Sequence, residues 1–223
     1  MTVNFQDLRV KMVDGQVRTT DVTDTAILDA MLSVPREAFV PETRRPFAYI
    51  DEDIELATSE AGSRRFLMKP SPFARLVQLA AIRPGDTVLD VGCNCGYSSA
   101  VLSRLAKSVV ALESDVALAG LAREVLQAQG CDNVSVVEGS LAAGHAAGAP
   151  YDVIIVNGSV DDVSQALLDQ LADSGRLVAV IGEGIAGRAM FYVKEDGVIS
   201  ARQAFNAAVR PLNEFRRIPA FEF

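Results

Sequence analysis

The chain has 223 residues, of which 49% are hydrophobic and 22% charged, a composition typical of a folded globular protein rather than a disordered one. Its 21 Lys and Arg against 29 Asp and Glu give a formal net charge of -8, which argues against binding of phosphate-rich nucleic acid. The first ten residues are too polar for a secretory signal and every apolar run is too short to cross a bilayer, so we expect a cytoplasmic protein without membrane contact.

The N-terminal part, residues 1–82, predicts a helical extension rather than a second core. Apolar residues from Asp24 to Leu32 have helical spacing, and two prolines bound the irregular segment Val34 to Pro41. A further helix is predicted from Pro72 to Ala81. We expect this extension to form one structural unit with a larger α/β domain of residues 83–223.

The segment from Thr58 to Lys69, which includes Gly62, is polar and basic, and this composition predicts an exposed, mobile surface loop. Its cations are Arg64, Arg65 and Lys69. Two interpretations of these charges stay open: they attract an acidic acceptor, or they are ordinary solvated charges.

Residues 83–223 repeat a rhythm of apolar run, small-residue turn and helical pattern, which indicates parallel strands joined by crossover helices. The apolar runs are Thr87 to Val91, Val109 to Leu112, Val134 to Val137, Val153 to Val156 and Leu177 to Ile181. The helical patterns lie near Tyr97 to Leu105, Val116 to Ala128 and Val163 to Ala172. We therefore predict an α/β fold with a mostly parallel, doubly wound sheet, completed by an antiparallel hairpin of Met190 to Val193 and Ala201 to Phe205.

The strongest functional signal is Val88-Leu89-Asp90-Val91-Gly92-Cys93-Asn94-Cys95-Gly96-Tyr97, where an apolar strand ends in an acid and a glycine turn opens into a helix. Open α/β sheets bind ligands at such a place. Gly92 and Gly96 let a ligand approach the backbone, and Asn94 is among the few residues that tolerate a positive φ there. The four-residue glycine spacing fits neither the dinucleotide fingerprint nor the phosphate loop, so NAD and ATP are disfavoured.

Glu113 ends the next strand, and an acid there is placed to accept hydrogen bonds from both hydroxyls of a ribose. The alternative is that Asp90 only caps a helix and that Glu113 is a solvated surface charge.

The three cysteines, Cys93, Cys95 and Cys131, form no even disulfide framework, and the single histidine leaves them without the partners of a zinc site. We expect a reducing compartment and no metal. Cys93 and Cys95 are interpreted as small turn residues, with a redox pair as the alternative. His145 is assigned no role.

Several segments outside the glycine turn point to one family. They are Lys11-Met12-Val13, Gln16-Val17-Arg18, Ala30-Met31, Val34-Pro35-Arg36-Glu37-Ala38-Phe39-Val40-Pro41, Ala149-Pro150-Tyr151-Asp152, Gln170-Leu171 and Gly175-Arg176-Leu177-Val178. On these segments the chain resembles the protein-L-isoaspartate O-methyltransferase family over nearly its whole length. The resemblance implies a Rossmann-like class I methyltransferase fold, S-adenosylmethionine as cofactor and S-adenosylhomocysteine as product.

The resemblance also implies the site. Its residues for the methionine end of the cofactor are Asp90, Gly92, Cys93, Asn94 and Gly96. Glu113 would hold the ribose, with Ser114 beside it. The family usually has an acid near the adenine after the third strand, and this chain has Ser140 there, followed by Leu141.

One departure concerns the loop before the helix at Pro72. Family members carry Thr-Ile-Ser followed by Gln-Pro, with hydroxyls that help to position the substrate carboxylate. Aligned on Pro70, this chain has Phe66-Leu67-Met68-Lys69-Pro70 and lacks both hydroxyls. No catalytic residue is assigned.

The leading hypothesis is an S-adenosylmethionine-dependent O-methyltransferase of protein modification or repair, acting on a protein or peptide carboxylate or on a small-molecule acceptor. The alternative is a degenerate family member that binds the cofactor or its product as a sensor or partner-binding module, and the missing loop hydroxyls favour it. The glycine spacing disfavours a nicotinamide-dependent oxidoreductase.

Overall fold

The computed structural model describes residues 3–58 and 64–216, and a seven-stranded sheet lies at its centre. The strand order is β5-β4-β3-β6-β7-β8-β9. The strands are β3 (Thr87–Val91), β4 (Ser108–Glu113), β5 (Val134–Glu138), β6 (Tyr151–Val160), β7 (Leu171–Ile181), β8 (Arg188–Glu195) and β9 (Val198–Asn206). Strands β3 to β7 run parallel, and β8 and β9 are antiparallel. The predicted mostly parallel sheet with a C-terminal antiparallel hairpin is confirmed.

Side chains alternate between two buried clusters, one on each face of the sheet. Val88, Val109 and Ile155 belong to the cluster that also contains residues of α3 (Pro70–Ala80), α4 (Tyr97–Leu102) and α5 (Val116–Ala128). Leu89 and Ile154 belong to the opposite cluster, with a residue of α6 (Gln165–Asp169). Burial on both faces explains why these strands are almost continuously apolar.

The predicted helix from Val163 to Ala172 is shorter than expected, because β7 already begins at Leu171 and pairs there with Tyr151. Ser174 has a φ of 61°, and a side chain on Gly175 would lie 2.7 Å from a backbone oxygen. This local irregularity interrupts the strand pattern, so the sequence reveals only its second half.

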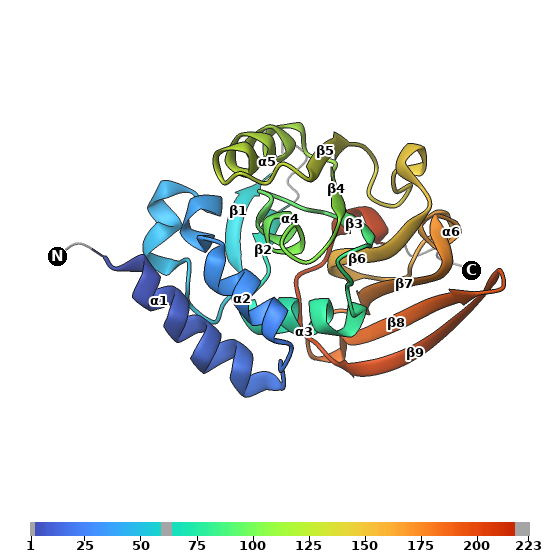
Figure 1. The fold of residues 1–223 in the computed structure, drawn as a ribbon, viewed down its shortest axis with the longest axis horizontal. Helices are drawn as coiled ribbons and strands as arrows, with labels where there is room; N and C mark the ends of the chain where they lie inside the picture. The colour runs from blue at the N-terminus through green and yellow to red at the C-terminus, as the bar shows by residue number, and fades with distance from the viewer. Residues whose placement is uncertain (1–2, 59–63, 217–223) are drawn as a thin grey trace, which may run out of the picture.

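The N-terminal helix α2 (Thr25–Ser33) packs against α3 and α4, and α1 (Phe5–Met12) packs against α2. Both lie on the opposite side of the molecule from the β8–β9 hairpin (Figure 1). Asp24 caps α2 by accepting a hydrogen bond from the Ala26 amide at 2.9 Å. Met31 is fully buried in the same cluster as α4. This packing supports the expected single unit, and the boundary near residue 82 stays a prediction.

Arg36 links segments within the extension and packs on Tyr97 of the α/β part. The side chain is fully buried, and its guanidinium donates to the carbonyls of Ala48 and Met68, each at 2.8 Å. It also lies over the ring of the buried Tyr97, 4.7 Å from the centroid, and Phe39 meets the same ring edge-on at 5.7 Å. Tyr97 therefore has the extension packed directly on its ring.

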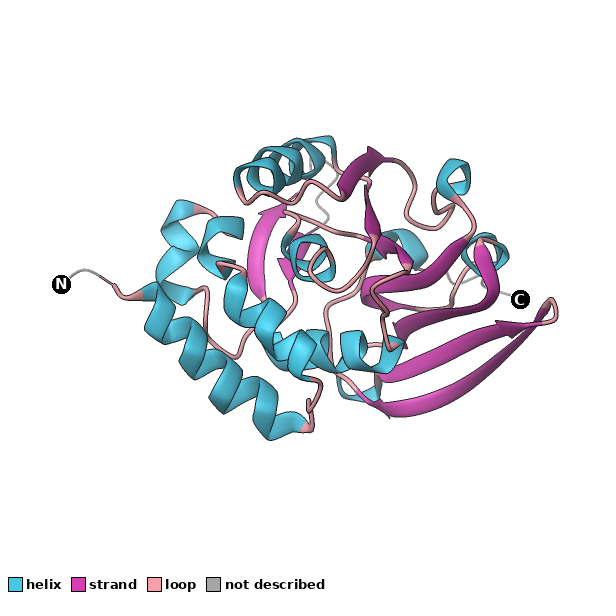
Figure 2. Ribbon diagram, in the orientation of Figure 1, coloured by secondary structure: helices cyan, strands magenta, loops and turns pink. Residues whose placement is uncertain are grey.

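The predicted surface loop between Thr58 and Lys69 is wrong for most of its described residues. β1 (Ile54–Thr58) and β2 (Arg64–Leu67) form an antiparallel pair that lies apart from the large sheet (Figure 2). Arg65 and Leu67 alternate inward, and Arg65 is only 6% exposed. Gly62 lies outside the described residues. The sequence did not predict this strand, because a buried Arg65 is explained only by its ion pair with Glu113, which is distant in sequence.

Across the two described ranges, the structure contains no helix whose length and hydropathy would suit it to span a membrane.

Candidate functional site

The carboxyl ends of β3, β4 and β5 bring most of the predicted site residues to one edge of the sheet. The turn after β3 runs from Gly92 to Gly96, Glu113 ends β4, and Ser140 and Leu141 follow β5. Glu113 lies opposite Glu138 in the register of β4 and β5. Parallel strands end at the same edge, and this is why residues so far apart in the sequence meet here.

The glycine turn has the backbone geometry expected of it. Gly92, Asn94 and Gly96 all have positive φ values, of 76°, 54° and 91°. The amides of Gly92 and Cys93 both donate to the Leu112 carbonyl, at 2.9 and 3.1 Å, and this fixes the turn against the end of β4. The expectation that Asn94 tolerates a left-handed conformation is confirmed.

Glu113 is held in the site by several hydrogen bonds and an ion pair. Its carboxylate is fully buried and accepts hydrogen bonds from the backbone amides of Asn94 at 2.8 Å, Ser114 at 2.8 Å and Asp115 at 3.0 Å. Arg65 adds an ion pair at 2.7 Å. Glu113 is therefore not a solvated surface charge.

Asp90 lies beneath the turn rather than open to a ligand. Its side chain is fully buried and accepts hydrogen bonds from Ser98 at 2.7 Å, Ser99 at 2.5 Å and Asn157. Burial raises the pKa of Asp90 to about 6, although these three hydrogen bonds oppose the rise. Asp90 thus fixes the first turn of α4 to β3. Its third partner, Asn157, was not predicted, although it directly follows the apolar run from Val153 to Val156.

Cys93, Cys95 and Gly96 have packing roles within the turn. Cys93 and Cys95 are buried free thiols, and burial raises the pKa of both, that of Cys95 to about 12. A side chain on Gly96 would meet Leu126 of α5 at 3.0 Å. Gly96 therefore makes room for α5, and the expectation that its missing side chain makes room for the ligand is not supported by this contact.

The C-terminal segment reaches the site, which no local sequence signal predicts. The Arg210 carbonyl and the Leu212 amide bond to Ser159 of β6, both at 2.9 Å, and Leu212 lies against Gly92. Glu214 accepts a hydrogen bond from the Leu141 amide at 3.1 Å and another from the Ser114 hydroxyl. These residues come to the strand ends only through the tertiary fold.

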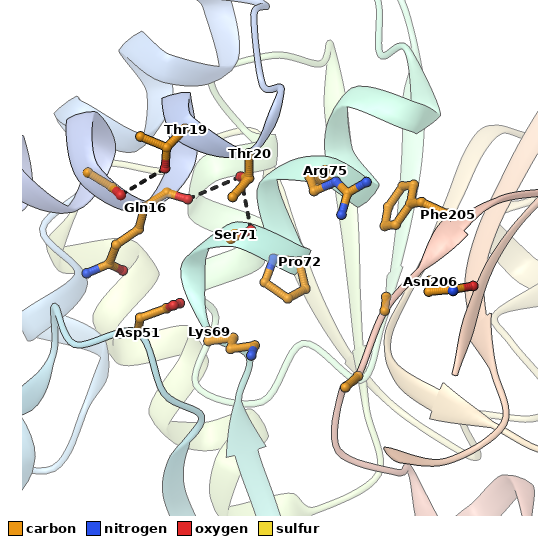
Figure 3. A pocket seen from close by; sticks show the side chains of 13 residues that line it. Gln16, Thr19, Thr20, Asp51, Lys69, Ser71, Pro72, Arg75, Phe205 and Asn206 are labelled. Atoms are coloured by element: carbon orange, nitrogen blue, oxygen red, sulfur yellow. Dashed lines mark hydrogen bonds between the residues drawn. The ribbon is translucent and has the colours of Figure 1, made fainter. Parts of the chain in front are cut away.

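Two neighbouring hollows share the lining residue Lys69, which directly precedes α3. One is lined by residues of the N-terminal segment, the start of α3 and the end of β9 (Figure 3). Thr20 donates to the Gln16 carbonyl there, and the Arg75 guanidinium lies 3.8 Å from the centroid of the Phe205 ring. The second hollow adjoins the C-terminal segment; its lining includes Asp53, Lys69, Glu183, Arg210 and Pro211. None of the predicted cofactor residues lines either hollow.

Comparison with known sequences gives one family. Residues 9–214 match the family described as Protein-L-isoaspartate(D-aspartate) O-methyltransferase (PCMT). The chain is 38% identical over 174 residues to a protein-L-isoaspartate O-methyltransferase of Koribacter versatilis (strain Ellin345), covering 78% of this chain and 76% of the relative. It is 39% identical over 176 residues to the enzyme of the same name from Methylorubrum extorquens (strain PA1), covering 79% and 75%.

Solved structures share the fold. One protein-L-isoaspartate O-methyltransferase superposes with a TM-score of 0.79 at 24% identity, covering 94% of this chain and 66% of that one. A Plasmodium falciparum structure of a protein-L-isoaspartate O-methyltransferase in complex with S-adenosyl-L-homocysteine gives a TM-score of 0.76 at 20% identity, covering 96% and 100%.

Proposed function

Because the chain belongs to the protein-L-isoaspartate(D-aspartate) O-methyltransferase family, we propose that it transfers a methyl group from S-adenosylmethionine to a carboxylate of a protein or peptide. The observation that carries the proposal is the buried Glu113 carboxylate at the end of β4, beside the glycine turn after β3. This is the place where an α/β sheet of this kind holds the ribose of a nucleoside cofactor.

The polar groups at the strand ends fit the cofactor in their chemistry. Glu113 would accept hydrogen bonds from the ribose hydroxyls, with Ser114 beside it. The Leu141 amide and the Ser140 hydroxyl would serve the adenine, and the turn from Gly92 to Gly96 would lie along the methionine end. Asp90 would act indirectly, because its hydrogen bonds hold α4 in place.

The reaction asks little acid or base chemistry of the protein. Bound S-adenosylmethionine supplies an activated methyl group, and its transfer to a carboxylate oxygen yields a methyl ester and S-adenosylhomocysteine. A carboxylate is already ionised at neutral pH, so no side chain has to remove a proton. The contribution of this chain is to bind and orient the two reactants.

The acceptor side is expected at the hollow beside Lys69 and Arg210. This hollow lies next to the Arg210-to-Leu212 segment, which leads directly to Gly92. Its charged lining residues are Lys69, Arg210 and Arg216 against Asp53 and Glu183. Arg210 pairs with Asp53 at 3.5 Å and Arg216 with Glu183 at 2.6 Å, so the charge of Lys69 is the formal excess. An acidic peptide is therefore the acceptor that this surface favours.

The cofactor assignment is tested by calorimetric titration with S-adenosylmethionine, S-adenosylhomocysteine and NAD. We expect binding of the first two and none of NAD. Glu113→Ala should weaken binding of S-adenosylhomocysteine by about 1.5 to 3 kcal/mol, the scale of a hydrogen bond to a charged group. Glu138→Ala is the matched control, because Glu138 is the register neighbour on β5 and forms an exposed ion pair with Arg123.

The Glu113 variant leaves the Arg65 guanidinium buried without its anion, so circular dichroism and a melting curve must show that it is still folded. A folded Glu113→Ala protein with unchanged affinity would contradict the ribose assignment. Binding of NAD in preference to S-adenosylmethionine would overturn the proposed function itself.

A further inference from the structure

The ribose-binding carboxylate already has a ligand within its own chain. Arg65 donates from Nη2 to Glu113 Oε2 at 2.7 Å, and the side chains are 8% and 0% exposed. The Asn94 amide fills a second position on Oε2, and the Ser114 and Asp115 amides fill those on Oε1. Each oxygen thus accepts at least two hydrogen bonds, which leaves no acceptor position for a ribose hydroxyl while Arg65 is present.

The rest of the Arg65 guanidinium is held in the same place. Its Nε donates to the Asn94 side-chain oxygen at 3.1 Å, and its Nη1 donates to the Ser114 hydroxyl at 3.3 Å. A side chain built on Gly92 would lie 3.6 Å from Arg65 Nη2 and 3.2 Å from Leu212. The space in front of the glycine turn is therefore filled by Arg65 and Leu212.

The adenine end is occupied in a similar way. Glu214 takes the Leu141 amide at 3.1 Å and the Ser114 hydroxyl. Ser114 thus joins Arg65 to Glu214, and one continuous set of hydrogen bonds runs from Glu113 to Leu141. Arg65 supplies donors where a ribose would donate, and Glu214 supplies an acceptor where an adenine nitrogen would accept.

We propose that Arg65 and Glu214 are internal competitors that occupy the ribose and adenine positions, so that an adenosine ligand binds only by displacing them. This inference rests on the proposed function for the identity of the ligand. A ligand that must first displace internal bonds binds more weakly than the same ligand at an open site. Its affinity is lower by the factor by which the ligand-free protein favours the internally bonded form over the open form. Removal of the competitor therefore raises the affinity.

The chain provides a matched control for Arg65. Arg64 is its neighbour on β2, but its side chain is 59% exposed, pairs with Glu55 and lies over the Phe66 ring. Arg64→Ala removes the same charge at the adjacent residue without touching Glu113. Without Arg65, the Glu113 carboxylate keeps three backbone amide donors, so Arg65→Ala leaves the ligand position formed.

The test is a titration of S-adenosylhomocysteine and of adenosine into the natural protein and into Arg65→Ala, Arg65→Lys, Arg64→Ala and Glu214→Ala. We expect Arg65→Ala to bind both ligands about 10- to 100-fold more tightly, and Arg65→Lys to lie between it and the natural protein. Glu214→Ala should also bind more tightly, and Arg64→Ala should not differ. In melting curves, Arg65→Ala should have a lower midpoint without ligand and a larger ligand-induced increase.

Equal affinity of the natural protein and folded Arg65→Ala would overturn the inference and leave the proposed function intact. Weaker binding by Arg65→Ala would also overturn it, because Arg65 would then be a ligand contact rather than a competitor. Failure of every variant to bind S-adenosylmethionine, S-adenosylhomocysteine or adenosine would overturn the proposed function and the inference with it.

Discussion

Asp90 shows how burial and hydrogen bonding act against each other on a single carboxyl group. The Asp90 side chain is fully buried, and burial raises the pKa of its carboxyl group to about 6 despite three hydrogen bonds. In an unfolded chain an Asp titrates near 3.9. The folded state therefore binds the Asp90 proton more tightly, and the stability from this proton is lost as the pH rises through 6.

Asp90→Asn removes this titration, so its effect on stability should depend on pH. Relative to the variant, the natural protein should gain about 2 kcal/mol in free energy of unfolding between pH 7.5 and pH 4.5. Urea unfolding of both proteins at the two pH values measures the difference, and other titrating groups cancel in the comparison. A pH-independent difference would show that Asp90 titrates normally.

Phe66 and Met68 decide a second residue-scale prediction. Met68 is 7% exposed, and the centroid of the Phe66 ring lies 5.1 Å from the Arg64 guanidinium carbon and 4.9 Å from that of Arg210. Neither side chain can donate a hydrogen bond to an isoaspartyl carboxylate. We expect slow or undetectable methylation of isoaspartyl peptides, well below the order of 10 per second typical of enzymes, and a gain in the double variant Phe66→Thr, Met68→Ser.

The measurement is transfer of a tritiated methyl group to an isoaspartyl peptide and to its aspartyl counterpart. Cofactor affinity serves as the control, because the substitutions leave the glycine turn and Glu113 untouched. Turnover by the natural protein at a typical enzymatic rate would refute this prediction.

Single residues were predictable where the backbone alone sets their role. Asn94 was expected to accept a positive φ, and Glu113 was expected at the strand end; both expectations hold for the geometry. Arg65, Leu212 and Glu214 were not assigned to the site, because a side chain's distant partner leaves no mark on its local sequence.

At the scale of elements, the contact between α4 and α5 depends on a missing side chain. A Cβ on Gly96 would lie 3.0 Å from Leu126, and its φ of 91° disfavours any other residue. Gly96→Ala should lower the free energy of unfolding by about 2 to 4 kcal/mol, from backbone strain and overpacking. Gly120→Ala on α5 is the control: no atom of the described residues lies within 4 Å of its added carbon, so stability should rise by about 0.5 to 1 kcal/mol.

Thermal and urea unfolding measure both variants. A Gly96→Ala protein as stable as the natural one would show that α4 and α5 adjust without cost. Reduced ligand binding by a stable Gly96→Ala protein would instead restore the original expectation that this glycine faces the ligand.

Strands were predictable from the sequence where burial on both faces of the sheet requires a continuous run of apolar residues. The run from Thr87 to Val91 matches β3 residue for residue, and the pattern from Val116 to Ala128 matches α5. β2 was missed because a charged residue occupies an inward position, which ordinary alternation does not allow. The first half of β7 was missed because a local irregularity at Ser174 and Gly175 interrupts it.

For the whole molecule, the shared core predicts one cooperative transition. The extension and the α/β part bury their side chains in a common cluster. The chain has no tryptophan, so Phe5→Trp and Tyr192→Trp each place a single reporter in one part. We expect the two reporters and far-ultraviolet circular dichroism to give the same urea midpoint. Two separated midpoints would show that residues 1–82 unfold as an independent domain.

The burial of Tyr97 beneath Arg36 has a spectroscopic consequence that extends to every tyrosine. The sequence has four tyrosines, and burial raises the pKa of each phenol, that of Tyr151 to about 12. In an unfolded chain the phenols ionise near pH 10. The native protein should therefore show little phenolate absorbance at a pH where the urea-unfolded chain is largely ionised. Above that pH the fold loses the stability that the protonated phenols provide, so the phenolate absorbance should appear together with alkaline unfolding.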